Sequence, residues 1–137
     1  MKVEDKQLLI EDLCARLSYG VKISVEDKVE TLQGINIPDN IVEYDSFLAS
    51  DIEEVRPYLF PMSSMTEEQY WEMEKIASDD YMENIQNAKE LNEKVDFIRH
   101  LPLYCPNVIN WFNKNHFDYR VLIEKGLAID ATGKNIY

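Results

Sequence analysis

The architecture of this chain follows from residues 21–33, which read VKISVEDKVETLQ. Apolar residues occupy every second position of residues 21–25, and this period of two is typical of a half-buried β-strand. Residues 26–27 form a short acidic turn, and residues 29–33 resume the alternation. The segment therefore predicts a β-hairpin with one face toward a core.

A helix is predicted before the hairpin, over residues 4–18. Its apolar stripe, at helical spacing, consists of Ile10, Leu13, Cys14 and Leu17. Gly20 is placed to end the helix in a left-handed conformation. Residues 41–44 are short, apolar and β-branched, and they predict a third strand. The three strands would form a small antiparallel meander that the helix covers on one face.

Residues 45–65 allow more than one interpretation. A brief turn fits residues 51–55, and Pro57 and Pro61 favour extended backbone at the residues before them. A short edge strand and an ordered loop fit this segment equally well. Three consecutive large apolar residues, at positions 58–60, are expected to pack against the rest of the protein.

From Thr66 the pattern becomes helical. Thr66 and Gln69 have the spacing of a capping box. The apolar stripe that follows consists of Tyr70, Met73 and Ala77. A second helix is predicted over residues 84–101, and a third from Pro106, because proline is favoured at the first helical position. A last short helix over residues 119–125 would end at Gly126, and residues 130–137 are expected to fray.

Together these elements predict an α+β protein. It would have an N-terminal helix and a small antiparallel three-strand meander, followed by three to four C-terminal helices. The change from strands to helices near residue 62 could mark a subdomain boundary. A single domain over residues 1–137 is preferred, because a three-strand meander with one helix has a thin core on its own.

The chain is strongly acidic, with 26 Asp and Glu against 14 Lys and Arg and a net charge of −12. Most of this charge lies in the first two-thirds of the chain, and the balance argues against direct binding to nucleic acid. The first residues are charged, and no run of about 18 apolar residues is present. Neither a secretory signal nor a membrane span is predicted, and the expected location is the cytoplasm.

Reactive side chains are few. The four glycines are scattered, which argues against a phosphate-binding loop. A small cluster in the sequence consists of His100, Cys105, His116 and Asp118. Its spacing matches no familiar zinc pattern, and no surrounding motif supports a nucleophilic pair of Cys105 with His100 or His116. We therefore assign no catalytic residue, no metal ligand and no cofactor, and we expect Cys14 and Cys105 to be reduced thiols.

Two other features are relevant to binding. One is a run of carboxylates: Glu67, Glu68, Glu72, Glu74, Asp79, Asp80 and Glu83. A solvated helix face explains this run, and an array that mimics nucleic-acid phosphates is the alternative. The other is a candidate interaction surface that consists of Trp111, Phe117, Tyr119 and Arg120. Such residues dominate binding hot spots, although aromatic residues at helical spacing more often belong to a core.

Three segments carry a resemblance: EDLCARL at residues 11–17, PYLFPMSSMTEE at residues 57–68 and HFDYRVLIEKGLA at residues 116–128. The chain resembles a group of short uncharacterised proteins of gut anaerobic bacteria and their phage-like or mobile gene regions. The resemblance implies a bacterial intracellular setting and a role in a mobile element. It implies no catalytic or ligand-binding residue.

The expected function is that of a small cytosolic interaction or accessory protein, which is not an enzyme and has a protein partner. Two alternatives stay open. One is an acidic nucleic-acid-mimicking inhibitor of a DNA-binding enzyme. The other is an enzyme with a Cys/His site that sequence patterns do not identify.

Overall fold

The computed structural model of the protein describes residues 1–45, 48–79 and 106–137. The chain divides into two compact units. Unit 1 contains residues 1–59 and 122–137, and unit 2 contains residues 60–121. The chain therefore leaves unit 1 just before residue 62, where the sequence changes from strands to helices, and its last residues return to unit 1.

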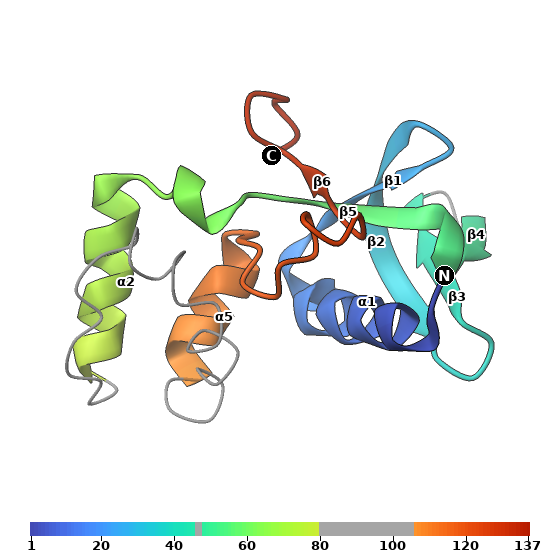
Figure 1. The fold of residues 1–137 in the computed structure, drawn as a ribbon, viewed down its shortest axis with the longest axis horizontal. Helices are drawn as coiled ribbons and strands as arrows, with labels where there is room; N and C mark the ends of the chain where they lie inside the picture. The colour runs from blue at the N-terminus through green and yellow to red at the C-terminus, as the bar shows by residue number, and fades with distance from the viewer. Residues whose placement is uncertain (46–47, 80–105) are drawn as a thin grey trace. The chain divides into compact units, whose positions relative to one another are not determined.

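Unit 1 is a mixed sheet covered by one helix (Figure 1). Its elements in chain order are α1 (Val3–Arg16), the 3₁₀ turn η1 (Leu17–Tyr19), β1 (Lys22–Val25), β2 (Lys28–Asn36), β3 (Ile41–Tyr44), β4 (Leu48–Asp51), the 3₁₀ turn η3 (Ile52–Glu54), β5 (Val55–Leu59) and β6 (Ile129–Asp130). The six strands lie in the order β4-β3-β2-β1-β5-β6. All neighbours are antiparallel except β5 and β6, which are parallel.

The predicted three-strand meander is wrong as a description of this sheet. β1, β2 and β3 do pair as expected, but β4 adds to one side of them and β5 and β6 to the other. Three of the four residues of β4 are exposed, so its sequence lacks the alternation by which a strand is predicted. β6 has only two residues and pairs with a strand far earlier in the chain. Local patterns do not report such a long-range pairing.

The C-terminal half also differs from the expected three to four helices. The structure confirms α2 (Glu67–Asp79) and α5 (Pro106–Lys114), and α5 begins at the predicted proline. The helix predicted over residues 84–101 lies outside the described residues. Residues 119–125 form turns and no helix, so that prediction is wrong.

The turns that replace this last helix keep its closing signal. The Leu127 N–H donates to the Leu122 carbonyl at 2.9 Å, and the Gly126 N–H donates to the Ile123 carbonyl at 3.1 Å. Gly126 has a φ of 73°, so these are the bonds of a Schellman helix end. Val121 has a φ of 63°, which a β-branched residue adopts at a cost and which a helix does not tolerate. The closing bonds expected at Gly126 are therefore present, but they close a run of turns, and a helix through Val121 is incompatible with its positive φ.

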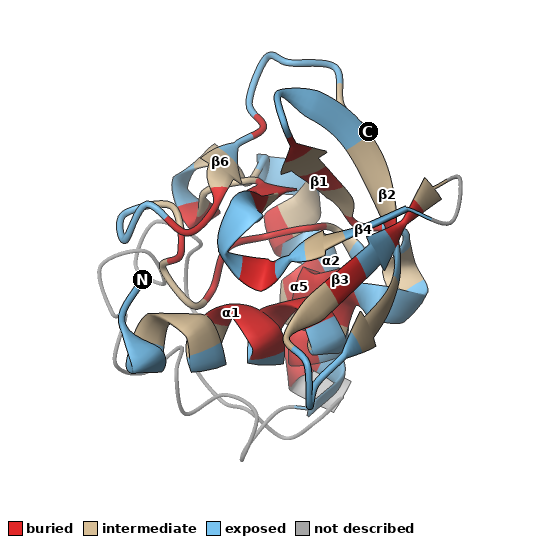
Figure 2. Cartoon of the chain, turned by 90° about the vertical axis from the view of Figure 1, so that its right-hand side faces the viewer, coloured by how far each residue is buried: buried red, intermediate tan, exposed pale blue. Residues whose placement is uncertain are grey.

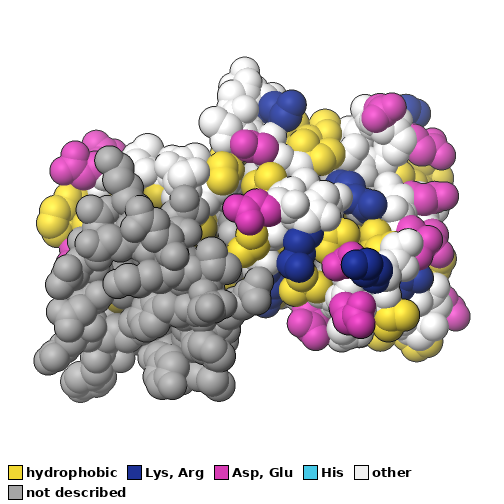
Figure 3. All heavy atoms as spheres, viewed as in Figure 1, with side chains coloured by type: hydrophobic (Ala, Val, Ile, Leu, Met, Phe, Trp, Pro, Cys, Tyr) yellow, Lys and Arg dark blue, Asp and Glu magenta, His cyan; other side chains and the backbone are white. Residues whose placement is uncertain are grey.

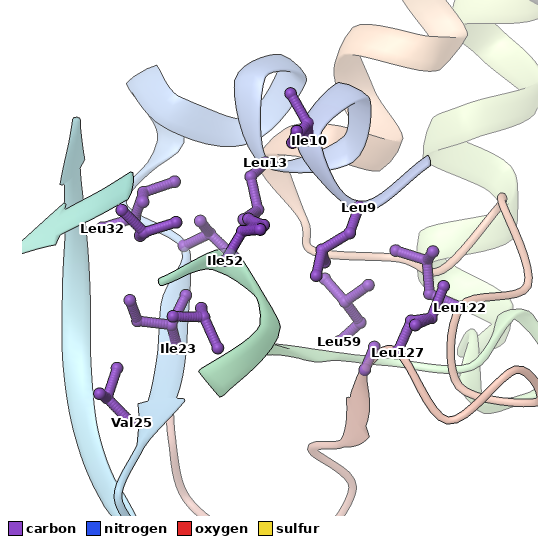
Figure 4. Packing of buried hydrophobic residues seen from close by; sticks show 14 of the residues in the cluster. Leu9, Ile10, Leu13, Ile23, Val25, Leu32, Ile52, Leu59, Leu122 and Leu127 are labelled. Carbon is purple, nitrogen blue, oxygen red and sulfur yellow. The ribbon is translucent and has the colours of Figure 1, made fainter. Parts of the chain in front are cut away.

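α1 covers one face of the sheet and forms the core of unit 1 with it (Figure 4). Leu9 and Leu13 of the helix are fully buried and lie toward Ile23, Ile52 and Leu59. Leu122 and Leu127, from the C-terminal part of the unit, lie beside Leu59 in the same cluster. The core is thus assembled from both ends of the chain.

The buried stripe of α1 is displaced from the expected one. Cys14 and Leu17 are exposed, whereas Asp12 and Arg16 are buried. Figure 2 shows buried, intermediate and exposed residues along α1. Arg16 Nε donates to Asp12 Oδ2 at 2.9 Å, and both side chains are 0% exposed. The face of α1 that packs on the sheet therefore contains an ion pair between residues one helical turn apart.

The tail at residues 130–137, expected to fray, contributes hydrogen bonds to unit 1. The Ala131 N–H donates to the Leu59 carbonyl at 2.8 Å. The Tyr137 hydroxyl accepts from the Lys22 N–H at 2.9 Å and donates to the Tyr58 carbonyl at 2.7 Å. Tyr137 thus connects β1 and β5 through their backbones.

These contacts predict an alkaline pH dependence of stability. Burial raises the pKa of the Tyr137 hydroxyl, and this effect outweighs the opposing hydrogen bond from the Lys22 N–H and the charge of Arg16. Because the folded state holds the proton more tightly than the unfolded state, the stabilisation is complete below the usual tyrosine pKa of 10.0 and is lost as the pH rises above it. Tyr137→Phe should cost about 1 kcal/mol at neutral pH, through the lost hydrogen bonds.

The measurement is urea unfolding of the wild type and Tyr137→Phe between about pH 8 and about pH 11.5. The difference in unfolding free energy should shrink above about pH 10, while the other tyrosines affect both proteins alike. A difference that stays constant over this range would contradict the prediction.

Unit 2 has its own core, between α2, α5 and the residues that follow α5. Its buried members are Met62, Tyr70, Met73, Ala77, Val108, Ile109, Trp111, Phe112, Phe117 and Tyr119. The Phe60 N–H donates to the His116 carbonyl, and the Asp118 N–H donates to the Phe60 carbonyl, both at 2.8 Å. These bonds attach the segment after α5 to the start of the unit.

Candidate functional site

The four residues of the candidate interaction surface all lie in unit 2, and the structure brings them into two pairs. Trp111 and Phe117 stack with ring centroids 5.6 Å apart. The Arg120 guanidinium carbon lies 4.5 Å from the centroid of the Tyr119 ring. The three aromatic residues are buried and Arg120 is half-buried. This burial favours the alternative interpretation, in which the aromatic residues form a core.

A buried hydrogen bond fixes Tyr119 in that core. Its hydroxyl donates to Asn113 Oδ1 at 2.8 Å, and its ring stacks on Phe112 with centroids 5.7 Å apart. Asn113 is itself buried near the end of α5. Tyr119 therefore holds the chain against the helix it has just left, which is a structural role.

The structure describes two of the four residues in the candidate Cys/His cluster. His100 and Cys105 lie outside the described residues. His116 and Asp118 are buried in unit 2, on either side of Phe117. Within residues 1–45, 48–79 and 106–137, no three His, Cys, Asp or Glu side chains lie close enough to hold a metal ion.

Cys14 is the one cysteine among the described residues. It lies on the exposed side of α1, and partial burial raises the pKa of its thiol. The thiolate is the nucleophilic form, so this environment lowers the reactivity of Cys14 at neutral pH.

The outer side of α2 presents a different kind of surface, which we call the α2 face. It consists of Glu67, Glu68, Trp71, Glu72, Glu74 and Lys75. Trp71 is 58% exposed and is the largest exposed hydrophobic side chain among the described residues. Glu67 precedes Trp71 by four positions and Lys75 follows it by four, so the three share one row of the helix. Figure 3 shows acidic and hydrophobic side chains side by side over the start of α2.

Local sequence explains why α2 presents this face. The Thr66 N–H donates to Gln69 Oε1 at 2.9 Å and the Gln69 N–H donates to Thr66 Oγ1 at 3.2 Å, which confirms the capping box. On the opposite side of the helix, Tyr70, Met73 and Ala77 are buried in the core of unit 2. With that side anchored, the α2 face must point outward.

Trp71 is held against its neighbour. The rings of Tyr70 and Trp71 have centroids 5.3 Å apart at an interplanar angle of 58°. Because Tyr70 is buried, this contact packs one side of the exposed indole against the core of unit 2. The aromatic ring is presented on a helix whose position is fixed by the core.

Sequence patterns pointed to the carboxylates of the α2 face but not to Trp71 as their partner. The sequence feature that marks Trp71 is its position next to the stripe residue Tyr70, with glutamates before and after it. A tryptophan out of step with the apolar stripe is expected on the surface. The predicted surface instead contained the larger aromatic group near the C-terminus.

No protein-family model, curated protein or solved structure was found to match this chain. Among the helices of the described residues, none has the length and apolar character required to cross a membrane.

Proposed function

We propose that this protein is a non-enzymatic accessory protein of the cytoplasm that acts by binding another protein through the α2 face. The observation that supports the proposal is the 58% exposure of Trp71 on a helix whose opposite side is buried. The exposed apolar surface of an indole is unfavourable in water, and its burial against a partner contributes favourable free energy to binding. Tryptophan is also among the residues most enriched at the centres of protein interfaces.

The rigidity of the surface supports the same proposal. The capping box and the buried residues of α2 hold the helix that carries Trp71, and the Tyr70 ring packs against the indole. A preorganised anchor loses little conformational freedom when it binds.

The composition of the α2 face favours a protein interface centred on an aromatic anchor over nucleic-acid mimicry. A mimic needs a continuous array of carboxylates to follow a phosphate backbone. Here the large indole of Trp71 and the ammonium of Lys75 interrupt the carboxylates on the same row of the helix. An aromatic anchor surrounded by charges is the arrangement of a protein interface.

The test is photo-crosslinking in extracts of the organism that encodes the protein. A photoreactive phenylalanine analogue replaces Trp71 in one protein and Ile37, which is also 58% exposed, in a control. We expect one discrete adduct from position 71 and none from position 37. Excess wild-type protein should compete the adduct away, and excess Trp71→Ala should compete roughly fivefold less well, which corresponds to about 1 kcal/mol. Equal capture at both positions would overturn the proposal.

A further inference from the structure

We infer that the group seated on Trp71 in the complex is a cation, an arginine or lysine side chain on a basic surface of the partner protein. This inference rests on the proposed function and goes further, because it names the chemistry of the partner.

The charges around Trp71 carry the inference. Glu67 and Glu68 precede it by one helical turn, and Glu72 and Glu74 follow within the next turn. The four carboxylates outnumber the single ammonium of Lys75. Glu67 and Glu68 are in the first turn, so they offset the partial positive charge of the helix N-terminus. Among the described residues of the α2 face, the charges beside the indole therefore sum to a negative value.

Glu74 adds a fourth carboxylate to this surface. Its side chain is half-buried, at the edge of the α2 face. Glu74 lies three positions after Trp71, on the same side of α2.

The indole provides the second half of the recognition. The face of a tryptophan ring attracts a cation, and the attraction is strongest for tryptophan among the aromatic side chains. An arginine over Trp71 could stack on the ring and donate to a neighbouring carboxylate at the same time, because its guanidinium is planar and carries five N–H groups. A neutral or acidic partner would gain none of these contacts.

The experiment measures binding of a fluorescent hepta-arginine peptide to the full chain, with hepta-citrulline as the neutral control of the same shape. We expect binding of the arginine peptide only. Trp71→Ala should weaken it roughly two- to fivefold, and Trp71→Phe should weaken it less because an aromatic face remains. Glu68→Gln with Glu72→Gln should weaken it roughly three- to tenfold.

The matched control is Glu43→Gln with Glu54→Gln, which removes two exposed carboxylates from unit 1 and changes the net charge equally. The affinity of this control variant for the arginine peptide should stay within about twofold of the wild-type affinity, because the variant reduces only the overall negative charge of the protein. Equal weakening by the two double variants, or unchanged binding by Trp71→Ala, would overturn the inferred cation.

The two proposals can fail separately. A partner captured at position 71, together with peptide binding that ignores Trp71 and the α2 face, would reject the cation and retain the proposed function. Equal capture at positions 71 and 37 would reject the proposed function itself.

Discussion

Arg16→Met is expected to lower the free energy of unfolding by about 3–5 kcal/mol. Arg16 and Asp12 are both 0% exposed, and Arg16 Nε donates to Asp12 Oδ2 at 2.9 Å. Removal of the guanidinium leaves the Asp12 carboxylate buried beside the sheet without its countercharge. The length of methionine fills most of the vacated space, so the cost is electrostatic more than a loss of packing. Urea unfolding followed by circular dichroism measures the change.

The double variant Asp12→Leu with Arg16→Met separates the two contributions. Replacement of a whole buried ion pair by apolar residues is often neutral or stabilising, so most of the lost stability should return. The expected coupling between the two sites is therefore large, on the order of 3 kcal/mol. If the double variant is less stable than Arg16→Met alone, the unpaired buried charge does not account for the loss of stability and the prediction is wrong.

Phe112→Ala should destabilise unit 2 by about 3–5 kcal/mol. Phe112 is 0% exposed and packs edge-on against Trp111, with ring centroids 5.8 Å apart, and against Tyr119. Alanine leaves a cavity at the centre of the core that α2 and α5 share. Hydrogen exchange of the α5 amides should become faster, and the near-ultraviolet circular dichroism of Trp111 should weaken.

Lys114→Ala is the control for this prediction, because Lys114 lies on the same helix and is exposed. It should change the unfolding free energy by no more than about 0.5 kcal/mol. If α5 stays as protected in Phe112→Ala as in the control, the aromatic cluster does not hold unit 2 together.

The candidate site shows that sequence patterns do not determine which aromatic side chains on a helix are buried. Trp111 and Trp71 are both aromatic residues on helices, and the predicted surface included Trp111 but not Trp71. The structure buries Trp111 against Phe117 and exposes Trp71 beside Tyr70. Which side of a helix is covered depends on the residues that arrive from elsewhere in the chain, and those residues are not neighbours in sequence.

Features that depend on a few adjacent residues were readable from the chain alone. The hairpin at residues 21–33, the capping box at Thr66 and the helix start at Pro106 are all present. Each follows from backbone geometry within one or two turns, since side-chain period, capping atoms and the proline ring act locally.

Features that depend on distant residues needed the folded protein. β6 pairs with β5, Tyr137 bonds to Lys22 and Tyr58, and the side of α1 that packs on the sheet buries Asp12 and Arg16 and leaves the stripe residues Cys14 and Leu17 exposed. In each case the free energy comes from burial or hydrogen bonding between segments brought together by folding, and the residues involved carry no local pattern that announces it. The exposed Trp71, which carries the proposed function, is defined in the same way, by what the rest of unit 2 leaves uncovered.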